Sequence, residues 1–125
     1  MKRAIIIVDH GSRAAEANEV LEEIARALRG MTTDPVYVAH MDLVEPTIAQ
    51  AFDSAVRDGA DHVFVFPCFL APGRHSRQDI PRMCAEAAAR HTSVRWHCAE
   101  PFGADPTLAA LILRRLWSFD KEWKA

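Results

Sequence analysis

The chain has 125 residues, of which 50% are hydrophobic and 26% are charged, and its net charge is −2 at pH 7. This length suits a single domain spanning residues 1–125, and the composition is that of an ordinary globular protein. The charge balance excludes the broad basic surface typical of nucleic-acid-binding proteins. No apolar run approaches the ~20 residues that span a bilayer, so we expect neither a nucleic acid nor a membrane as partner.

The cysteines and the first residues point to a reducing compartment. The three cysteines are odd in number and widely spaced, and they form no C-x-x-C pair (Cys68, Cys84 and Cys98). This pattern favours free thiols over disulfides, a structural zinc site or an iron–sulfur cluster. The basic start "MKR" is followed by an apolar run too short for a secretory signal, so we expect a cytoplasmic protein.

Apolar runs and helical periodicities alternate four times along the chain. We expect strands at residues 4–8, 35–41, 62–69 and 93–99, with the first buried on both faces. We expect helices at residues 14–29, from Pro46 to the stop at Gly59, at 78–90, and from Pro106 onward behind an Asp105 cap. The predicted inner face of the first helix is Ala17, Val20, Leu21, Ile24, Ala27 and Leu28, and that of the last is Leu108, Leu111, Ile112 and Leu116.

This alternation predicts an α/β fold: a doubly wound, parallel, four-stranded sheet with helices on both faces. Ligands of such sheets bind beyond the carboxyl ends of the strands. Three loops should share that rim, and they carry most of the unexplained polar residues: "DHGSRAA", "HMDLVEPT" and "LAPGRHSRQD".

Two histidines follow strand ends in these loops. His10 precedes a glycine that lets the chain turn tightly, and His75 follows a Pro-Gly turn. Because the first and third strands of such sheets are often neighbours, the two imidazoles could converge on one cleft and hold Co²⁺, Fe²⁺, Ni²⁺ or Zn²⁺ in an open site. His40 is either a third ligand or a packed histidine bonded to backbone, and we favour the second interpretation. The remaining histidines are interpreted as structural (His62, His91 and His97).

Other charged groups lie on the same rim. Glu45 precedes Pro46, where its carboxylate can favour a helix start, handle protons or contact a ligand. Three arginines would make the cleft locally positive and suited to carboxylates or phosphates, unless they are surface residues paired with nearby acids (Arg13, Arg74 and Arg77). "DHGS" lacks the glycines of a dinucleotide or P-loop fingerprint, so its phosphate-loop signal is weak.

The segments "VDHGSRAAEANEVLEEIA", "AHMDLVEPTIAQAF" and "PCFLAPGRHSRQDIP", in this order and spacing, closely resemble the small sirohydrochlorin chelatases of the CbiX/SirB type. The resemblance covers roughly residues 4–116. It implies a flavodoxin-like fold that forms half of a class II chelatase, and insertion of Co²⁺ or Fe²⁺ into sirohydrochlorin on the routes to cobalamin or sirohaem. Some members of the family use Ni²⁺. The metal is then a substrate, and no permanently bound cofactor is expected.

The resemblance also assigns roles by position. It makes His10 the proton acceptor and a metal ligand, His75 the second metal ligand, and Glu45 a substrate contact. The matching substrate loop is Leu70, Ala71, Pro72, Gly73, Arg74 and His75. Longer relatives contain two such units in tandem, so a single unit suggests a homodimer.

Two other functions stay open at this point. The same cleft could belong to a tetrapyrrole or metal carrier without catalysis. A phosphohydrolase with His10 as nucleophile is the third hypothesis, although Asp9 occupies the place of the arginine usual in such enzymes.

Overall fold

The computed structural model describes residues 1–71, 73 and 76–120, and it consists of alternating strands and helices. Three residues of the expected substrate loop lie outside this described part (Pro72, Arg74 and His75). In chain order the elements are β1 (Arg3–Asp9), α1 (Ala15–Arg29), β2 (Val36–His40), α2 (Ile48–Arg57), β3 (His62–Pro67), α3 (Ser76–Ala88), β4 (Arg95–Cys98) and α4 (Pro106–Asp120).

The four strands form one parallel sheet in the order β2-β1-β3-β4. In register, Ile7 of β1 lies between Val38 of β2 and Phe66 of β3. The central position of β1 explains its continuous apolar run, because both of its faces are covered. The predicted parallel α/β fold is confirmed, and so is the expectation that the first and third strands are neighbours.

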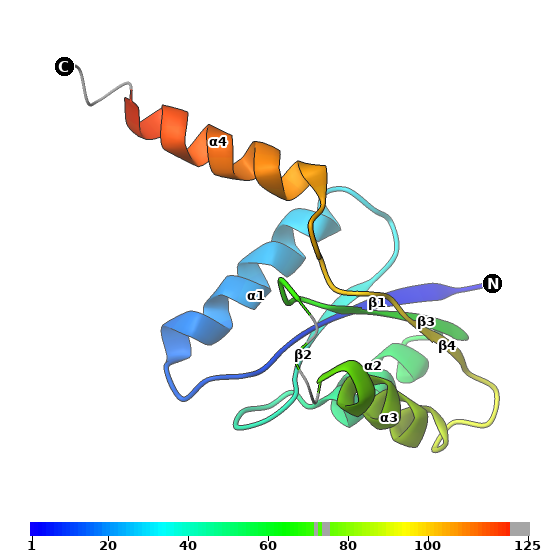
Figure 1. Ribbon diagram of the computed structural model, residues 1–125. Helices are drawn as coiled ribbons and strands as arrows, with labels where there is room; N and C mark the ends of the chain where they lie inside the picture. Colours follow the sequence, from blue (N-terminus) through cyan, green and yellow to red (C-terminus); the bar gives the residue numbers. More distant parts are fainter. Residues whose placement is uncertain (72, 74–75, 121–125) are drawn as a thin grey trace.

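Helices cover the two faces of the sheet unequally (Figure 1). α2 and α3 pack side by side on one face and enclose the larger core, in which Phe52 is fully buried. On the other face, α1 packs chiefly against β1 and β2 through Leu21 and Ala25. Across the described part of the chain, no helix is long and apolar enough to cross a membrane.

The start of α2 corrects one expectation. Pro46 is expected to be the first residue of this helix, but the N-cap is Thr47: its hydroxyl accepts a hydrogen bond from Gln50 N, while the Gln50 side chain accepts one from Thr47 N. This reciprocal pair satisfies two N–H groups at the helix end, so the helix begins at Ile48 and Pro46 stays outside it.

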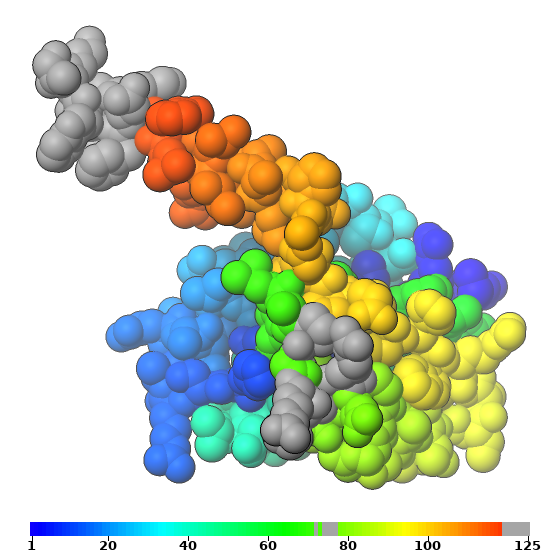
Figure 2. Space-filling model, viewed as in Figure 1, coloured from blue at the N-terminus to red at the C-terminus, as the bar shows by residue number. Residues whose placement is uncertain are grey.

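The inner faces expected for the first and last helices are also partly wrong. Val20 and Ile24 of α1 are 54% and 39% exposed, and Ile112 and Leu116 of α4 are 60% and 53% exposed. Figures 1 and 2 show the reason for α4, which projects from the body of the domain instead of lying on the sheet. The apolar periodicity is present, but these four side chains are not buried by the described part of the chain.

Candidate functional site

His10 lies at the carboxyl end of β1, beside the end of β3. Cys68 N donates to Val8 O over 2.7 Å, which continues the pairing of the two strands and sets the residues after them next to each other. The His10 ring contacts that of Phe69, with centroids 4.4 Å apart and ring planes at 36°. His10 is exposed, so a ligand above Phe69 can reach its imidazole.

A small cavity of about 230 Å³ opens beside His10. One wall is the turn after β1, where Ser12 N donates to the Asn18 side chain over 2.9 Å and Asn18 Nδ2 donates to Ser12 O over 2.7 Å. This exchange holds the turn against the first turns of α1. The cavity is lined by Asp9, His10, Gly11, Ser12, Ala17, Asn18, Cys68 and Phe69.

Asp9 and His40 form a pair behind His10. His40 is 4% exposed, and its Nδ1 lies 2.5 Å from Asp9 Oδ1, the same oxygen that accepts from Gly11 N over 3.0 Å. His40 is therefore a packed histidine, as we favoured, but the expected backbone partner of its ring is wrong. The partner is a carboxylate from the neighbouring strand, which sequence spacing does not reveal.

Two backbone hydrogen bonds tie the loop after β1 to the loop after β2. Met41 N donates to Asp9 O over 2.9 Å, and Asp42 N donates to His10 O over 3.1 Å. Gly11, with φ of 86°, fits beneath this crossing because it has no side chain. A Cβ there would lie 2.0 Å from Asp42 O, so the close approach of the two loops requires glycine.

Glu45 lies in the same β2–α2 loop that carries Asp42. Its carboxylate accepts from Gln50 Nε2 over 2.5 Å, which anchors it to the start of α2. His40 N donates to Pro46 O over 2.9 Å and holds the segment after Glu45 against the end of β2. The structure thus places Glu45 on the expected rim, in a loop bonded to that of His10.

The described part of the expected substrate loop is accessible. Leu70 is 72% exposed, and Ala71 and Gly73 are exposed as well. The loop is supported from behind, because Phe102 N donates to Phe69 O over 3.0 Å and Gly103 N donates to Leu70 O over 2.7 Å. The expected convergence of His75 on His10 stays a prediction, because His75 lies outside the described residues. The same holds for the expected roles of Pro72 and Arg74.

Among the described groups lining the cavity, Cys68 is held in its protonated form. Burial raises the pKa of the Cys68 thiol to about 11, the charge of Asp9 adds to the rise, and a hydrogen bond to the backbone of Val8 opposes it. Within residues 1–71, 73 and 76–120, no three His, Cys, Asp or Glu side chains gather closely enough to hold a metal ion.

The other three histidines lie away from this arrangement. His91 Nε2 lies 2.8 Å from Asp53 Oδ1, and His62 stacks on Phe64 with ring centroids 4.4 Å apart. His97 approaches the same phenyl ring at 6.3 Å. These contacts fit the structural roles expected for the three histidines. Arg13 is exposed in the turn after β1.

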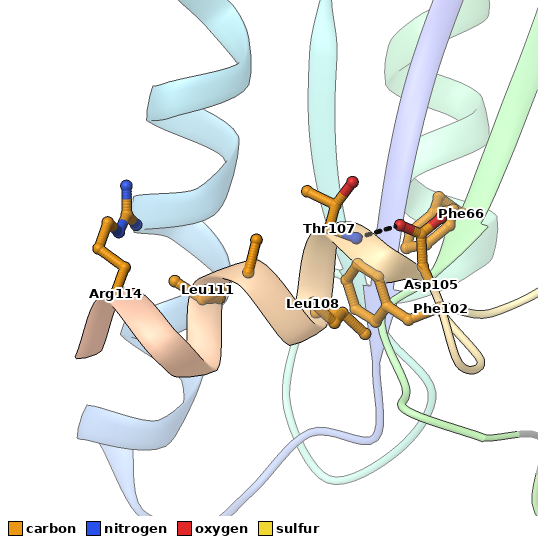
Figure 3. Close-up of a pocket in the computed structure, with 8 residues that line it drawn as sticks. Phe66, Phe102, Asp105, Thr107, Leu108, Leu111 and Arg114 are labelled. Carbon is orange, nitrogen blue, oxygen red and sulfur yellow. Dashed lines mark hydrogen bonds between the residues drawn. The ribbon is translucent and has the colours of Figure 1, made fainter. Parts of the chain in front are cut away.

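A larger cavity, of about 600 Å³, lies apart from His10 (Figure 3). It opens between the first turns of α4 and the rings of Phe66 and Phe102, which meet edge to face at 4.9 Å. Its ionisable lining residues, Asp105 and Arg114, lie at different turns of α4. This apolar hollow offers no described group suited to metal transfer.

Sequence reasoning missed Asp9 and Phe69 as parts of the site. Asp9 directly precedes His10, and alternation along β1 would have sent the two side chains to opposite faces. Phe69 directly precedes the expected substrate loop and is the last residue of the strand expected at 62–69. Neither position has a motif of its own; strand pairing and the turn after β1 give them their places.

The comparisons with known proteins agree on one family. The CbiX family model matches residues 4–118. The chain is 42% identical over 113 residues to the chloroplastic sirohydrochlorin ferrochelatase of Arabidopsis thaliana, covering 90% of this chain and 50% of that protein. It is 33% identical over 134 residues to the sirohydrochlorin cobaltochelatase of Methanopyrus kandleri, covering 90% of this chain and 94% of that protein.

A solved structure is similar over the same span. The sirohydrochlorin chelatase SirB from Bacillus subtilis subspecies spizizenii, in complex with cobalt, superposes with a TM-score of 0.85 at 33% identity, covering 94% of this chain and 51% of that one. The chain spans about half the length of the chloroplastic and Bacillus relatives that it matches.

Proposed function

The chain belongs to the CbiX family, and from this membership we propose that it is a sirohydrochlorin chelatase. It inserts Co²⁺ or Fe²⁺, with Ni²⁺ as a further candidate, into sirohydrochlorin for cobalamin or sirohaem synthesis. The observation that carries the proposal is the exposed imidazole of His10, fixed at the carboxyl end of the central strand beside the Phe69 ring.

Metal insertion releases two pyrrole protons for each divalent ion that enters the ring, so the site needs a ligand and a base. A neutral imidazole can do both in turn: its free nitrogen binds the arriving ion, and after transfer it accepts a proton. His10 is the described residue suited to this double role.

The substrate is a flat macrocycle with carboxylate side chains, and the rim offers a matching surface. Phe69 and the exposed Leu70 and Ala71 provide apolar contacts for the ring. Arg13 and Arg74 would pair with carboxylates at the edge. Glu45 would contact the ring or receive released protons, and His75 would be the second metal ligand.

The Asp9–His40 pair positions His10. It fixes the Asp9 side chain, while the backbone bonds from Met41 and Asp42 fix the two peptides on either side of the His10 Cα. Because these bonds set the direction in which the imidazole leaves the strand, they act on the reaction through geometry.

A homodimer is part of the proposal, with the cytoplasm as its compartment. Relatives named as ferrochelatases are about twice as long as this chain, so a second copy would supply what their other half supplies. A relative of nearly the same length carries the name of a cobaltochelatase.

The test is anoxic metallation of sirohydrochlorin with Co²⁺, Fe²⁺ and Ni²⁺, followed by absorbance. The wild-type chain should accelerate insertion of at least one ion above the rate without protein. His10→Ala should lower that rate by at least about 10²-fold, the usual contribution of a general base. His62→Ala is the matched control, because His62 lies at the amino end of β3, and it should keep the wild-type rate.

Two results would overturn the proposal. A spectral shift on binding without faster insertion would make the protein a carrier of tetrapyrrole or metal. Full activity in both His10→Ala and His75→Ala would remove the imidazoles from the mechanism.

A further inference from the structure

Two of the three cysteines meet between the sheet and α3. In the pairing of β3 with β4, Cys98 is in register with Val65, and residues in register point to the same face of a sheet. Val65 is 1% exposed and enters the core beneath α2 and α3, so Cys98 points to that side as well. α3 contacts β4 there (Figure 1), and its Cys84 is fully buried in the same core, against which Cys98 packs.

The two thiols are hydrogen-bonded to each other. Cys84 donates its thiol proton to Cys98 Sγ. Cys98 Sγ in turn lies 3.7 Å from Ala99 O, to which its own proton can be donated. The register of β4, the burial of Cys84 and this bond together place the two sulfur atoms side by side.

The surroundings make the two thiols chemically unequal. The hydrogen bond from Cys84 lowers the pKa of the Cys98 thiol, while burial and the carboxylate of Glu100 oppose the shift. The pKa of the Cys84 thiol is raised, first by the same hydrogen bond and then by burial. Because the thiolate is the reactive form of cysteine, Cys98 is the better nucleophile of the two.

Cys98 is also the accessible member of the pair. It is the last residue of β4, an edge strand of the sheet, and it is half-buried, whereas Cys84 is 0% exposed. A thiol with thiolate character, exposed to solvent and in contact with a second thiol, has the arrangement found at redox-sensitive cysteines.

We propose that Cys98 and Cys84 form a peroxide-sensitive dithiol, in which a hydroperoxide oxidises Cys98 and Cys84 then closes a disulfide. In the first step the Cys98 thiolate forms an S–O bond, the O–O bond breaks, and the departing hydroxide takes a proton to become water. In the second step Cys84 Sγ attacks the sulfenic sulfur, the S–O bond breaks, and the hydroxyl leaves as water with the Cys84 proton. Two thiols lose two electrons in total, and hydrogen peroxide gains them to give two waters. This chemistry goes beyond metal insertion and does not depend on it.

The disulfide would join the two supports of the expected substrate loop. α3 follows that loop, and the segment after β4 holds it through the bonds from Phe102 N to Phe69 O and from Gly103 N to Leu70 O. A bond between Cys84 and Cys98 therefore ties α3 to the strand whose continuation supports Leu70.

Cys68 provides an internal control. It packs with the smaller core on the α1 side of the sheet, opposite to Cys84. Its separation from Cys84 in the sequence is similar to that of Cys98. A preference of Cys84 for Cys98 must therefore come from the fold and not from chain length.

The experiment treats the reduced full chain with hydrogen peroxide, in native buffer and in concentrated urea. In native buffer the intact mass should fall by about 2 Da, dithiothreitol should reverse the loss, and peptide mapping should find Cys84 linked to Cys98 with Cys68 free. In urea the link should lose this selectivity. The oxidised chain should also unfold at a higher urea concentration than the reduced chain, because the new bond closes a loop in the unfolded state.

Three variants separate the roles of the thiols. Cys84→Ala should keep a sulfenic acid on Cys98 that dimedone traps, because the second thiol is missing. Cys98→Ala should leave Cys84 reacting with peroxide at least about 10-fold more slowly than Cys98 does in the wild type. Cys68→Ala is the matched control and should form the disulfide at the wild-type rate. The wild-type peptide map decides the proposal even where a variant loses its fold.

Four results would contradict the dithiol. A native link through Cys68 or between two chains would show that the fold does not bring Cys84 to Cys98. Oxidation of the wild type to sulfinic acid without a disulfide would show that Cys84 cannot resolve the sulfenic acid. Sulfenic acid on Cys84 in Cys98→Ala, formed as fast as on Cys98, would remove the assigned order. A lower urea midpoint after oxidation would show that the native packing does not accommodate the bond.

Discussion

Replacing Gly11 with alanine tests whether the crossing of two loops sets the position of His10. Gly11 has φ of 86°, and an added Cβ would lie 2.0 Å from Asp42 O and 3.1 Å from the His40 Cβ. Since Cβ contacts essentially never fall below 3.0 Å, one of the two loops must shift by about 1 Å. The nearest obstacle is backbone, so no side-chain rotation relieves it.

Two costs follow from this geometry. The left-handed backbone costs alanine about 1–2 kcal/mol, and the loop shift adds to the loss in the free energy of unfolding. A misplacement of ~1 Å at a reacting group can lower a rate by about 10²-fold. We therefore expect Gly11→Ala to be measurably less stable in urea and at least about 10²-fold slower in metallation.

Gly59→Ala is the matched control. Gly59 also has a positive φ, of 107°, but its added Cβ meets only the Lys2 side chain at 3.5 Å, and it follows α2 at the opposite end of the sheet. It should lose stability through its backbone conformation and keep the wild-type metallation rate. Equal rates in the two variants would refute the link between the crossing of the loops and the position of His10.

Two further substitutions test the packing near the site, and one titration tests a buried group at the other end of the sheet. Thr47→Ala removes the hydroxyl that caps α2 and should lower the free energy of unfolding by about 1 kcal/mol in urea denaturation. His40→Leu leaves Asp9 without its histidine partner and should cost about 1–3 kcal/mol while slowing metallation. Burial, followed by the hydrogen bond to Asp58, raises the pKa of Tyr37 to about 12, so the tyrosinate absorbance of the folded chain should titrate near pH 12.

The raised pKa of Tyr37 also makes the stability of the folded chain depend on pH. The pKa of Tyr37 is higher in the folded chain than in the unfolded chain, so its contribution is complete below about pH 10 and is lost as pH rises toward 12. Tyr37 is the only tyrosine, which makes the absorbance change unambiguous. A folded-state midpoint near 10 would contradict the burial argument. Unchanged stability of Thr47→Ala would contradict the capping role of the Thr47 hydroxyl. Unchanged stability of His40→Leu would contradict a stabilising role of the Asp9–His40 pair.

The sequence by itself determined the fold class and the edge of the sheet at which the site lies. A short continuous apolar run such as residues 4–8 favours a strand covered on both faces, and alternation with helices makes such strands parallel. Parallel strands have their carboxyl ends at one edge of the sheet, which predicts a common rim for His10 and Glu45. The motifs and their spacing predicted the family, and the match to the CbiX family model confirmed it.

The tertiary structure decided which groups meet. Periodicity marks the apolar side of a helix but not the surface it contacts, so Ile112 and Leu116 were expected to face the chain's own core and instead face away from it. The bond between Asp9 and His40 joins residues on neighbouring strands, and no local pattern encodes such a pairing. Short-range physics sets strands, helices and turns, whereas partners far apart in the chain depend on how those elements pack together.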